Sequence, residues 1–358
     1  MLSLTVLLVV AQHASMRVAG LALAGCTAGL ALTAPVRGRL ADRYGVTRIA
    51  ALCCVAFIPA ALGLLGAVLA RQPAAVLLAL ATAVGLVMPP LSPGLRKLWS
   101  VQAPAELVQT AFALDAAVFD LAYITGPVVA SSVAVGVAPA AALGVMLGLT
   151  VAALAVIGNR FPPETSPVAR RISLGPLRSG ALRRLLITAA LTNVALTATE
   201  VALTASMRLN HSLWAIGPLL AELSVGSILG SLLLGTRPPA SSTRRRLSRF
   251  LAAYTGGLVA LTAAVLVTPL LLAVATPLAG LFLGPTLATL FTSASSAVPH
   301  GNGTEAQAWL NSTMNGGAAG GAALAGLFAS QPIVGLSLAA GAAALAALSA
   351  TLLRGADG

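Results

Sequence analysis

Long apolar runs separated by short polar stretches constrain the fold of this chain more than any other feature. Val18–Val36 and Ile49–Leu69 are two such runs, and neither contains a charged residue. A helix needs about 20 residues to cross the roughly 30 Å hydrocarbon core of a bilayer. Only 8% of the residues are charged, against about 25% in soluble domains, so a water-soluble protein is excluded. Regular apolar–polar alternation is absent, and lipid offers no partners to backbone groups, so the sequence predicts an all-α integral membrane protein.

Apolar runs interrupted by charge, proline, glycine and asparagine divide the chain into twelve predicted membrane segments. They cover about 1–13, 17–36, 48–69, 73–94, 108–132, 138–158, 184–206, 213–235, 250–268, 270–293, 306–329 and 333–353. The first is too short to span on its own, so we expect the outer part of a first helix, which a truncated gene could explain.

Basic residues test this count, because they gather in the cytoplasmic loops of membrane proteins. With a cytoplasmic N-terminus, only Arg17, Arg71 and Arg208 fall in outer loops, and the remaining 18 of the 21 basic residues fall in inner ones. The count and the orientation therefore support each other, with both termini in the cytoplasm.

The longest polar stretch, residues 159–183, is basic and rich in proline, and it divides the twelve segments six and six. We therefore predict an N-terminal half (1–158), a cytoplasmic linker (159–183) and a C-terminal half (184–358). The halves echo each other, because the second helix of each carries three glycines and is followed by a basic loop. These glycines are Gly20, Gly25 and Gly29 in the first half, and Gly226, Gly230 and Gly235 in the second. Two such halves around a central substrate site are typical of secondary transporters.

The loop after the second segment, "GRLADRYGVTR", resembles the signature between helices 2 and 3 of the major facilitator superfamily. The matching positions are Gly38, Leu40, Asp42, Arg43, Gly45 and Arg48. The resemblance implies a twelve-helix fold of two pseudo-symmetric halves. It also implies that this loop is a conformational latch, in which Asp42 meets a helix end of the other half when the inner side is closed. A simple topology anchor is the alternative, but it would explain neither Asp42 nor Gly45.

The fifth segment partly resembles the antiporter motif of this family. Gly126 and Pro127 match its Gly-Pro pair, while Ala130 and Ser131 replace the two glycines that follow. All four residues are small or kink-forming, so an ordinary proline kink with close helix packing is the alternative.

Four acidic residues fall inside predicted membrane segments. They are Asp115 and Asp120 in the fifth segment, Glu200 in the seventh and Glu222 in the eighth. Ionisable groups within a bilayer are costly and usually serve ion or substrate pathways, so we expect proton coupling or substrate contact. Structural pairing inside the bundle is the alternative for each.

The eleventh segment, "AQAWLNSTMNGGAAGGAALAGLF", combines polar and small residues. Asn311 and Asn315 belong to its polar half, while Gly316/Gly320 and Gly317/Gly321 form two overlapping small-xxx-small pairs. We expect this helix to form a sliding wall of the cavity. The runs "TEAQAWLNST" and "ALDAAVFDLAYITGP" are similar to an efflux-like group of actinobacterial facilitator proteins.

Other classes of function find no support in the sequence. The three cysteines lie in apolar runs without metal-ligand spacing, and phosphate-binding loops and nucleophile elbows are absent. We therefore expect no metal, no cofactor, no enzymatic activity and no nucleic-acid partner.

The prediction is a monomeric plasma-membrane transporter that exports a small organic molecule by alternating access, coupled to protons. Two departures weigh against proton antiport: the first helix lacks an acidic residue, and the fourth lacks the buried arginine common in drug–proton antiporters. The alternatives are uptake, sugar-type transport, or a truncated relative that acts as a membrane scaffold or sensor.

Overall fold

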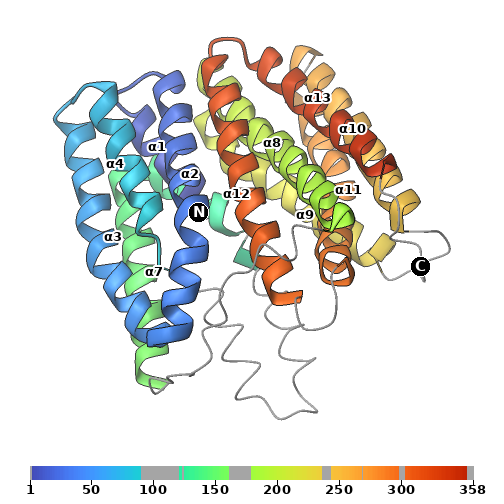
Figure 1. The fold of residues 1–358 in the computed structure, drawn as a ribbon. Coiled ribbons are helices and arrows are strands. Elements are labelled where there is room, and N and C mark those ends of the chain that lie inside the picture. The colour runs from blue at the N-terminus through green and yellow to red at the C-terminus, as the bar shows by residue number, and fades with distance from the viewer. Residues whose placement is uncertain are drawn as a thin grey trace.

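The fold is described from a computed structural model, which covers residues 2–89, 121–122, 125–160, 179–235, 243–267, 269–297 and 303–352. All regular structure within these residues is helical, and twelve helices follow one another as the sequence predicts (Figure 1). The helices are α1 (Leu2–Ala11), α2 (Met16–Tyr44), α3 (Val46–Leu69), α4 (Ala74–Leu86), the helix Thr125–Gly136, α7 (Pro139–Arg160), α8 (Gly180–Leu209), α9 (Ile216–Gly235), α10 (Thr243–Val267), α11 (Pro269–Ser296), α12 (Gly303–Leu327) and α13 (Pro332–Thr351). A short 3-10 helix, η2 (Leu213–Ala215), precedes α9.

Eight of the described helices are long and apolar enough to cross a membrane, so the chain is a multi-pass membrane protein. Three are shorter, namely α1, α4 and Thr125–Gly136. The 25 residues of α12 give it the length but not the apolar composition, because its first half is polar.

Several helix boundaries differ from the apolar runs. The segment predicted as a loop after residue 36 is helical through Tyr44, and Gly45 alone separates α2 from α3. Gly45 has φ 89°, a left-handed conformation that glycine adopts without steric cost. The fourth helix, predicted to reach residue 94, ends at Leu86, shortly before Pro89 and Pro90 in the sequence. Proline lacks an N–H and cannot continue a helical hydrogen-bond ladder.

Helix packing repeats between the two groups of six. In the first group α2 packs on α4, α3 packs on α4 and α7, and α1 packs on α7. In the second group the corresponding pairs are α9 with α11, α10 with α11 and α13, and α8 with α13. The equivalence of these pairs is the pseudo-symmetry that the sequence predicts.

Glycines at four-residue spacing mediate the same contact in both groups. Gly25 and Gly29 of α2 face Thr82 and the backbone of α4. Gly226 and Gly230 of α9 face backbone atoms of Pro277 and Leu281 in α11. A side chain at Gly29, Gly226 or Gly230 would overlap with backbone atoms of the neighbouring helix. These glycines therefore allow the close approach of the helices.

The two ends of the bundle differ in charge. We call the end at which α2 ends and α8 and α10 begin the basic end, because it carries Arg37–Arg48, Arg183, Arg184 and Arg244–Arg249. We call the other the short-loop end, because it holds the brief connections after α1, α3, α8 and α12. The groups of six contact each other at the short-loop end, where α2 packs on α12.

Candidate functional site

A buried polar stripe runs along α8. Asn193, Thr197, Glu200 and Thr204 follow one another at spacings of four, three and four residues, which places them on one face of the helix. Asn193, Thr197 and Thr204 are buried and Glu200 is half-buried. We call these four residues the α8 stripe.

Hydrogen bonds within α8 satisfy part of the stripe. The hydroxyl of Thr204 donates to the Glu200 carbonyl oxygen at 2.7 Å, and Nδ2 of Asn193 donates to the Ala189 carbonyl oxygen at 3.1 Å. Side chains that bond back to their own helix can be buried at low cost. The Glu200 carboxyl group is the ionisable member of the stripe.

Tyr254 of α10 is a further buried polar side chain in the second group of helices. It is fully buried within the large apolar cluster. Sequence reasoning missed Tyr254, since a single tyrosine in an apolar helix gives no periodic signal.

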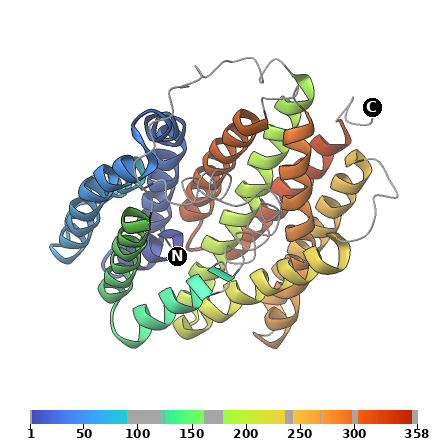
Figure 2. The same cartoon turned by 90° about the horizontal axis from the view of Figure 1, so that it is seen from below.

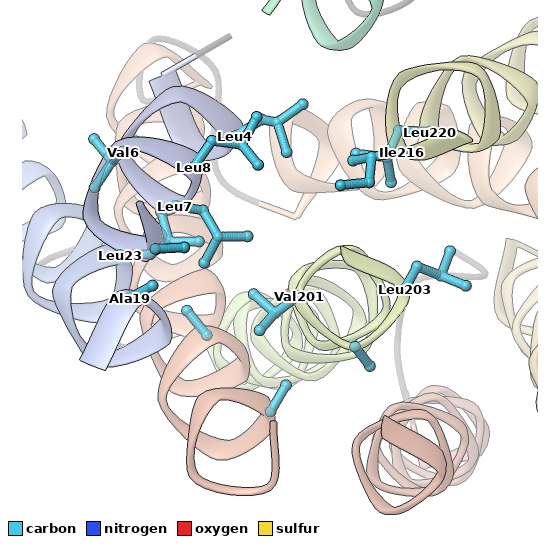
Figure 3. Close-up of a cluster of buried hydrophobic side chains, with 14 of the residues drawn as sticks. Leu4, Val6, Leu7, Leu8, Ala19, Leu23, Val201, Leu203, Ile216 and Leu220 are labelled. Carbon is cyan, nitrogen blue, oxygen red and sulfur yellow. The ribbon is translucent and has the colours of Figure 1, made fainter. Parts of the chain in front are cut away.

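An apolar cluster closes the short-loop end next to the α8 stripe (Figure 3). It joins side chains of α1 and α2 to side chains of α8 and α9, across the two groups of six helices. The labelled members are Leu4, Val6, Leu7, Leu8, Ala19, Leu23, Val201, Leu203, Ile216 and Leu220. Glu200 directly precedes Val201 in α8, so its backbone lies beside this cluster.

Two further cross-contacts reinforce the closed end. A guanidinium nitrogen of Arg208 at the end of α8 lies 3.8 Å from Sδ of Met16 in α2. Gly20 of α2 meets Gly326 of α12 backbone to backbone. Towards the basic end, the same two helices diverge (Figure 1).

The predicted polar residues of α12 share the face that meets α2. Asn315 donates through Nδ2 to the carbonyl oxygen of Asn311 one turn earlier, at 3.0 Å. Ala322 and Gly326 continue this face, and they contact Gly20 of α2. The two asparagines therefore lie on the α2-facing side of α12, nearer to the basic end than Ala322 and Gly326.

The four glycines of the predicted small-xxx-small pairs in α12 have unequal surroundings. Gly317 and Gly321 lie against the α8 backbone at Ala190 and Val194, where an added Cβ would overlap with the carbonyl groups of α8. A Cβ at Gly316 would meet open space, and one at Gly320 would make ordinary contact with Val194 at 3.7 Å. One of the two predicted small-xxx-small pairs forms a helix–helix contact.

The helix Thr125–Gly136 holds the predicted Gly-Pro pair. Gly126 is buried, and the carbonyl oxygen of Pro127 lies beside Gly217 of α9, together with the side chain of Ser131. This helix therefore contacts the other group of six. Asp115 and Asp120 lie outside the described residues.

The surroundings of Glu222 differ from those of the α8 stripe. It is on α9, on the face that also carries exposed Val225 and Leu229. Its Oε2 atom is buried and has no hydrogen-bond partner among the described residues.

The signature segment occupies the last turns of α2 and the first turn of α3. Gly38, Asp42 and Arg43 lie within α2, Gly45 is the break, and Arg48 is exposed in α3. The side chains of Asp42 and Arg43, which the latch would use, lie outside the described residues.

Arg37, directly before this segment, links α2 to the end of α4. It is 6% exposed, and its guanidinium donates to the carbonyl oxygens of Met88 and, at 3.2 Å, Leu30. The Thr33 hydroxyl donates to the Leu86 carbonyl oxygen at 2.9 Å. The last carbonyls of a helix have no partner within the helix. Thr33 therefore caps the end of α4, and Arg37 holds the chain two residues beyond it. In the sequence, Arg37 stands only as one of the 18 basic residues that fall in predicted inner loops.

Among the residues that the structure describes, no group of three histidine, cysteine, aspartate or glutamate side chains could hold a metal ion.

Comparison with known proteins gives one family and a set of similar structures. The family model of the Major Facilitator Superfamily matches residues 1–323. A bacterial homologue of the iron transporter ferroportin, solved in an inward-facing state, superposes with a TM-score of 0.72 at 14% identity, covering 98% of this chain and 92% of that one. The human organic anion transporter MFSD10 (TETRAN) gives a TM-score of 0.66 at 16% identity, with 95% and 86% covered. No curated protein sequence matches.

Proposed function

The chain belongs to the Major Facilitator Superfamily, and on that premise we propose that it exports a small organic molecule across the plasma membrane by proton-coupled alternating access. The observation that carries this proposal is a half-buried carboxyl group, Glu200, on a polar face inside an otherwise apolar bundle. Burying an ionisable group inside a membrane protein costs free energy. Residues of this kind are usually retained because they serve a transport pathway.

The arrangement of the two ends supports an inward-open state. The apolar cluster of Figure 3 closes the short-loop end, and α2 and α12 diverge towards the basic end. The arginine distribution favours a cytoplasmic basic end, with both chain termini on that side. In this state the substrate would reach the α8 stripe from the cytoplasm.

The chemistry of the stripe favours some substrates over others. It offers a carboxyl group, an amide and two hydroxyl groups, so a cationic or hydrogen-bonding molecule suits it better than an anion. The two similar structures are related to transporters of different cargoes, iron and organic anions. Their sequence identity to this chain is too low to favour either cargo.

Proton coupling follows if Glu200 holds either a proton or the substrate. Substrate binding would then release the proton towards the cytoplasm. Protonation of Glu200 from the outside would displace the substrate to the outside. Asp115, Asp120, Glu222, Asn311 and Asn315 are the further groups that we propose for proton or substrate contact.

The latch completes the cycle in this proposal. Asp42, held at the end of α2 between Gly38 and Gly45, would dock against a helix end of the other half when the basic end closes. Arg43 and Arg48 would pair with acidic groups in the same state. The transporter would work as a monomer, since both halves of the site come from one chain.

The experiment begins with a binding screen on the purified full chain. Thermal unfolding is followed in the presence of a panel of cationic, neutral and anionic organic compounds. Compounds that stabilise the protein are then assayed for flux in proteoliposomes under an imposed pH gradient. We expect Glu200→Gln to abolish the gradient-driven flux and to leave the unfolding temperature unchanged, because the two side chains have the same shape.

Glu305→Gln, at the start of α12, is the matched control and should transport as the unchanged protein does. Unchanged flux in Glu200→Gln would contradict proton coupling through this residue. A folded protein that moves no compound in either vesicle orientation would favour a scaffold or sensor, and flux that accumulates compound on the cytoplasmic side would establish uptake.

A further inference from the structure

Five exposed arginines cluster at the basic end of the second group of helices. Arg183 and Arg184 lie in the first turn of α8, and Arg244, Arg245 and Arg249 lie in the first two turns of α10. We call this set the basic corner.

Packing brings the helix ends that carry the basic corner together. Leu182 of α8, Leu247 of α10 and Ala350 of α13 belong to one buried cluster. Arg184 donates to the carbonyl oxygen of Leu352 and so links α8 to the end of α13. In both views these three helix ends gather near the mark for the C-terminus (Figures 1 and 2).

The charge of this corner is one-sided. Among the described residues, Glu305 is the one acidic residue at this end of the second group. It directly precedes Ala306, which belongs to the same buried cluster. The positive ends of two helix dipoles, those of α8 and α10, add to the arginine charges. Arg246 stacks over the Phe250 ring with 5.6 Å from its guanidinium carbon to the ring centroid. Guanidinium groups bind phosphate oxygens in bidentate fashion.

Apolar side chains continue from the corner into the bilayer. Ile187 lies one turn beyond Arg183 on α8 and is 54% exposed. Leu345 and Leu348 of α13 are 56% and 59% exposed, and Leu352, directly after this helix, is 60% exposed. A ligand at this corner would meet arginines at one end and an apolar helix surface at the other.

From this juxtaposition we infer that the basic corner is a binding site for an anionic phospholipid, with the headgroup phosphate on the arginines and the acyl chains along α8 and α13. A soluble anion would use the arginines and leave the apolar surface unused. Basic clusters beside membrane helices attract anionic headgroups at about 1 kcal/mol per arginine.

The test is native mass spectrometry of the full chain in detergent, with added phosphatidylglycerol, cardiolipin or phosphatidylcholine. We expect anionic lipids to be retained and to raise the unfolding temperature, and phosphatidylcholine to do neither. The double variant Arg183→Gln/Arg249→Gln should weaken the retention of anionic lipid by about tenfold to thirtyfold. The matched double variant Arg17→Gln/Arg71→Gln removes two exposed arginines from the short-loop end and should retain lipid normally.

Equal losses in the two double variants would show a diffuse charge effect and overturn the site. Stabilisation by inorganic phosphate as strong as that by lipid would overturn the phospholipid assignment. If the glutamine variant does not fold, Arg183→Lys/Arg249→Lys keeps both charges, and it should bind anionic lipid more weakly because an ammonium group lacks the bidentate fork. Binding of anionic lipid at full strength by that variant would contradict arginine-specific recognition.

Discussion

Arg37 shows how one side chain can fix the chain just beyond a helix that belongs to another part of the sequence. It donates to the carbonyl oxygen of Met88, two residues past the end of α4, and Thr33, one turn earlier on α2, caps the last carbonyl of α4 itself. The 13 residues of α4 rise about 20 Å, which is less than the thickness of a bilayer core. A helix that ends this early needs partners for its free carbonyls, and a buried cation is a favourable one.

Arg37→Gln should therefore destabilise the fold by about 1–3 kcal/mol, the usual cost of losing hydrogen bonds from a charged group. Chemical unfolding of the purified chain in detergent measures this change. Arg48→Gln is the control, because Arg48 is exposed, and its effect should stay within about 0.5 kcal/mol. Equal effects of the two substitutions would refute this role of Arg37.

The sequence singles out Glu200 of the candidate site but not its surroundings. Glu200 was conspicuous because charge is rare in this chain. Asn193, Thr197 and Thr204 were missed, although their spacing relative to Glu200 could have shown one polar face. The role of Arg37 could not have been predicted, because its partners are backbone carbonyls beyond a helix end that no side-chain pattern marks.

At the scale of elements, glycine spacing decides which helices come close. The pairs Gly226/Gly230 and Gly280/Gly284 interlock α9 with α11, and Gly317/Gly321 brings α12 onto α8. Helix association in lipid depends on such close packing, since apolar burial gives little advantage there.

Neighbouring glycines of α12 provide a matched test of this packing. Gly317→Ala should destabilise the protein by about 1–3 kcal/mol, because the new methyl group would overlap with the α8 backbone. Gly316→Ala should be neutral or stabilising by up to about 1 kcal/mol, because its methyl group meets open space and alanine favours the helix. Chemical unfolding in detergent measures both, and a reversed order would show that this contact is absent from the folded protein.

Helix number and order were predictable because each apolar run corresponds to a membrane span. The residues at which helices begin and end were less predictable. The ladder of backbone hydrogen bonds continues beyond the apolar run at Tyr44 of α2 and at Gly180 and Thr243, where α8 and α10 begin. It stops before the run does at Leu86 of α4.

For the whole molecule, the proposed alternating-access cycle makes the close contact between α2 and α12 a property of one conformational state. Gly20 and Gly326 meet backbone to backbone at the short-loop end. In an alternating-access cycle this contact must separate when that end opens. A side chain at Gly20 would therefore penalise the closed state and leave the opened state unaffected.

Gly20→Val should shift the population towards opening at the short-loop end. Spin labels at Gln12 and Gln331, two exposed loop positions in opposite halves, report this by their distance distribution in a background without the three native cysteines. We expect a longer distance in Gly20→Val than in the unchanged protein. Gly66→Val, where a side chain meets open space, should leave the distribution as it is. An unchanged distribution in Gly20→Val would mean that the two glycines do not control opening.

The contact of Gly20 with Gly326 also limits which substitutions the sequence can accept during evolution. Overpacking at a helix contact is normally relieved by a smaller residue on the opposite helix. Here both partners are already the smallest residue, so no second substitution at either position can compensate for a first. The two positions are therefore fixed together, and a search for suppressors of Gly20→Ala should find them elsewhere in α2 and α12 and never at Gly326.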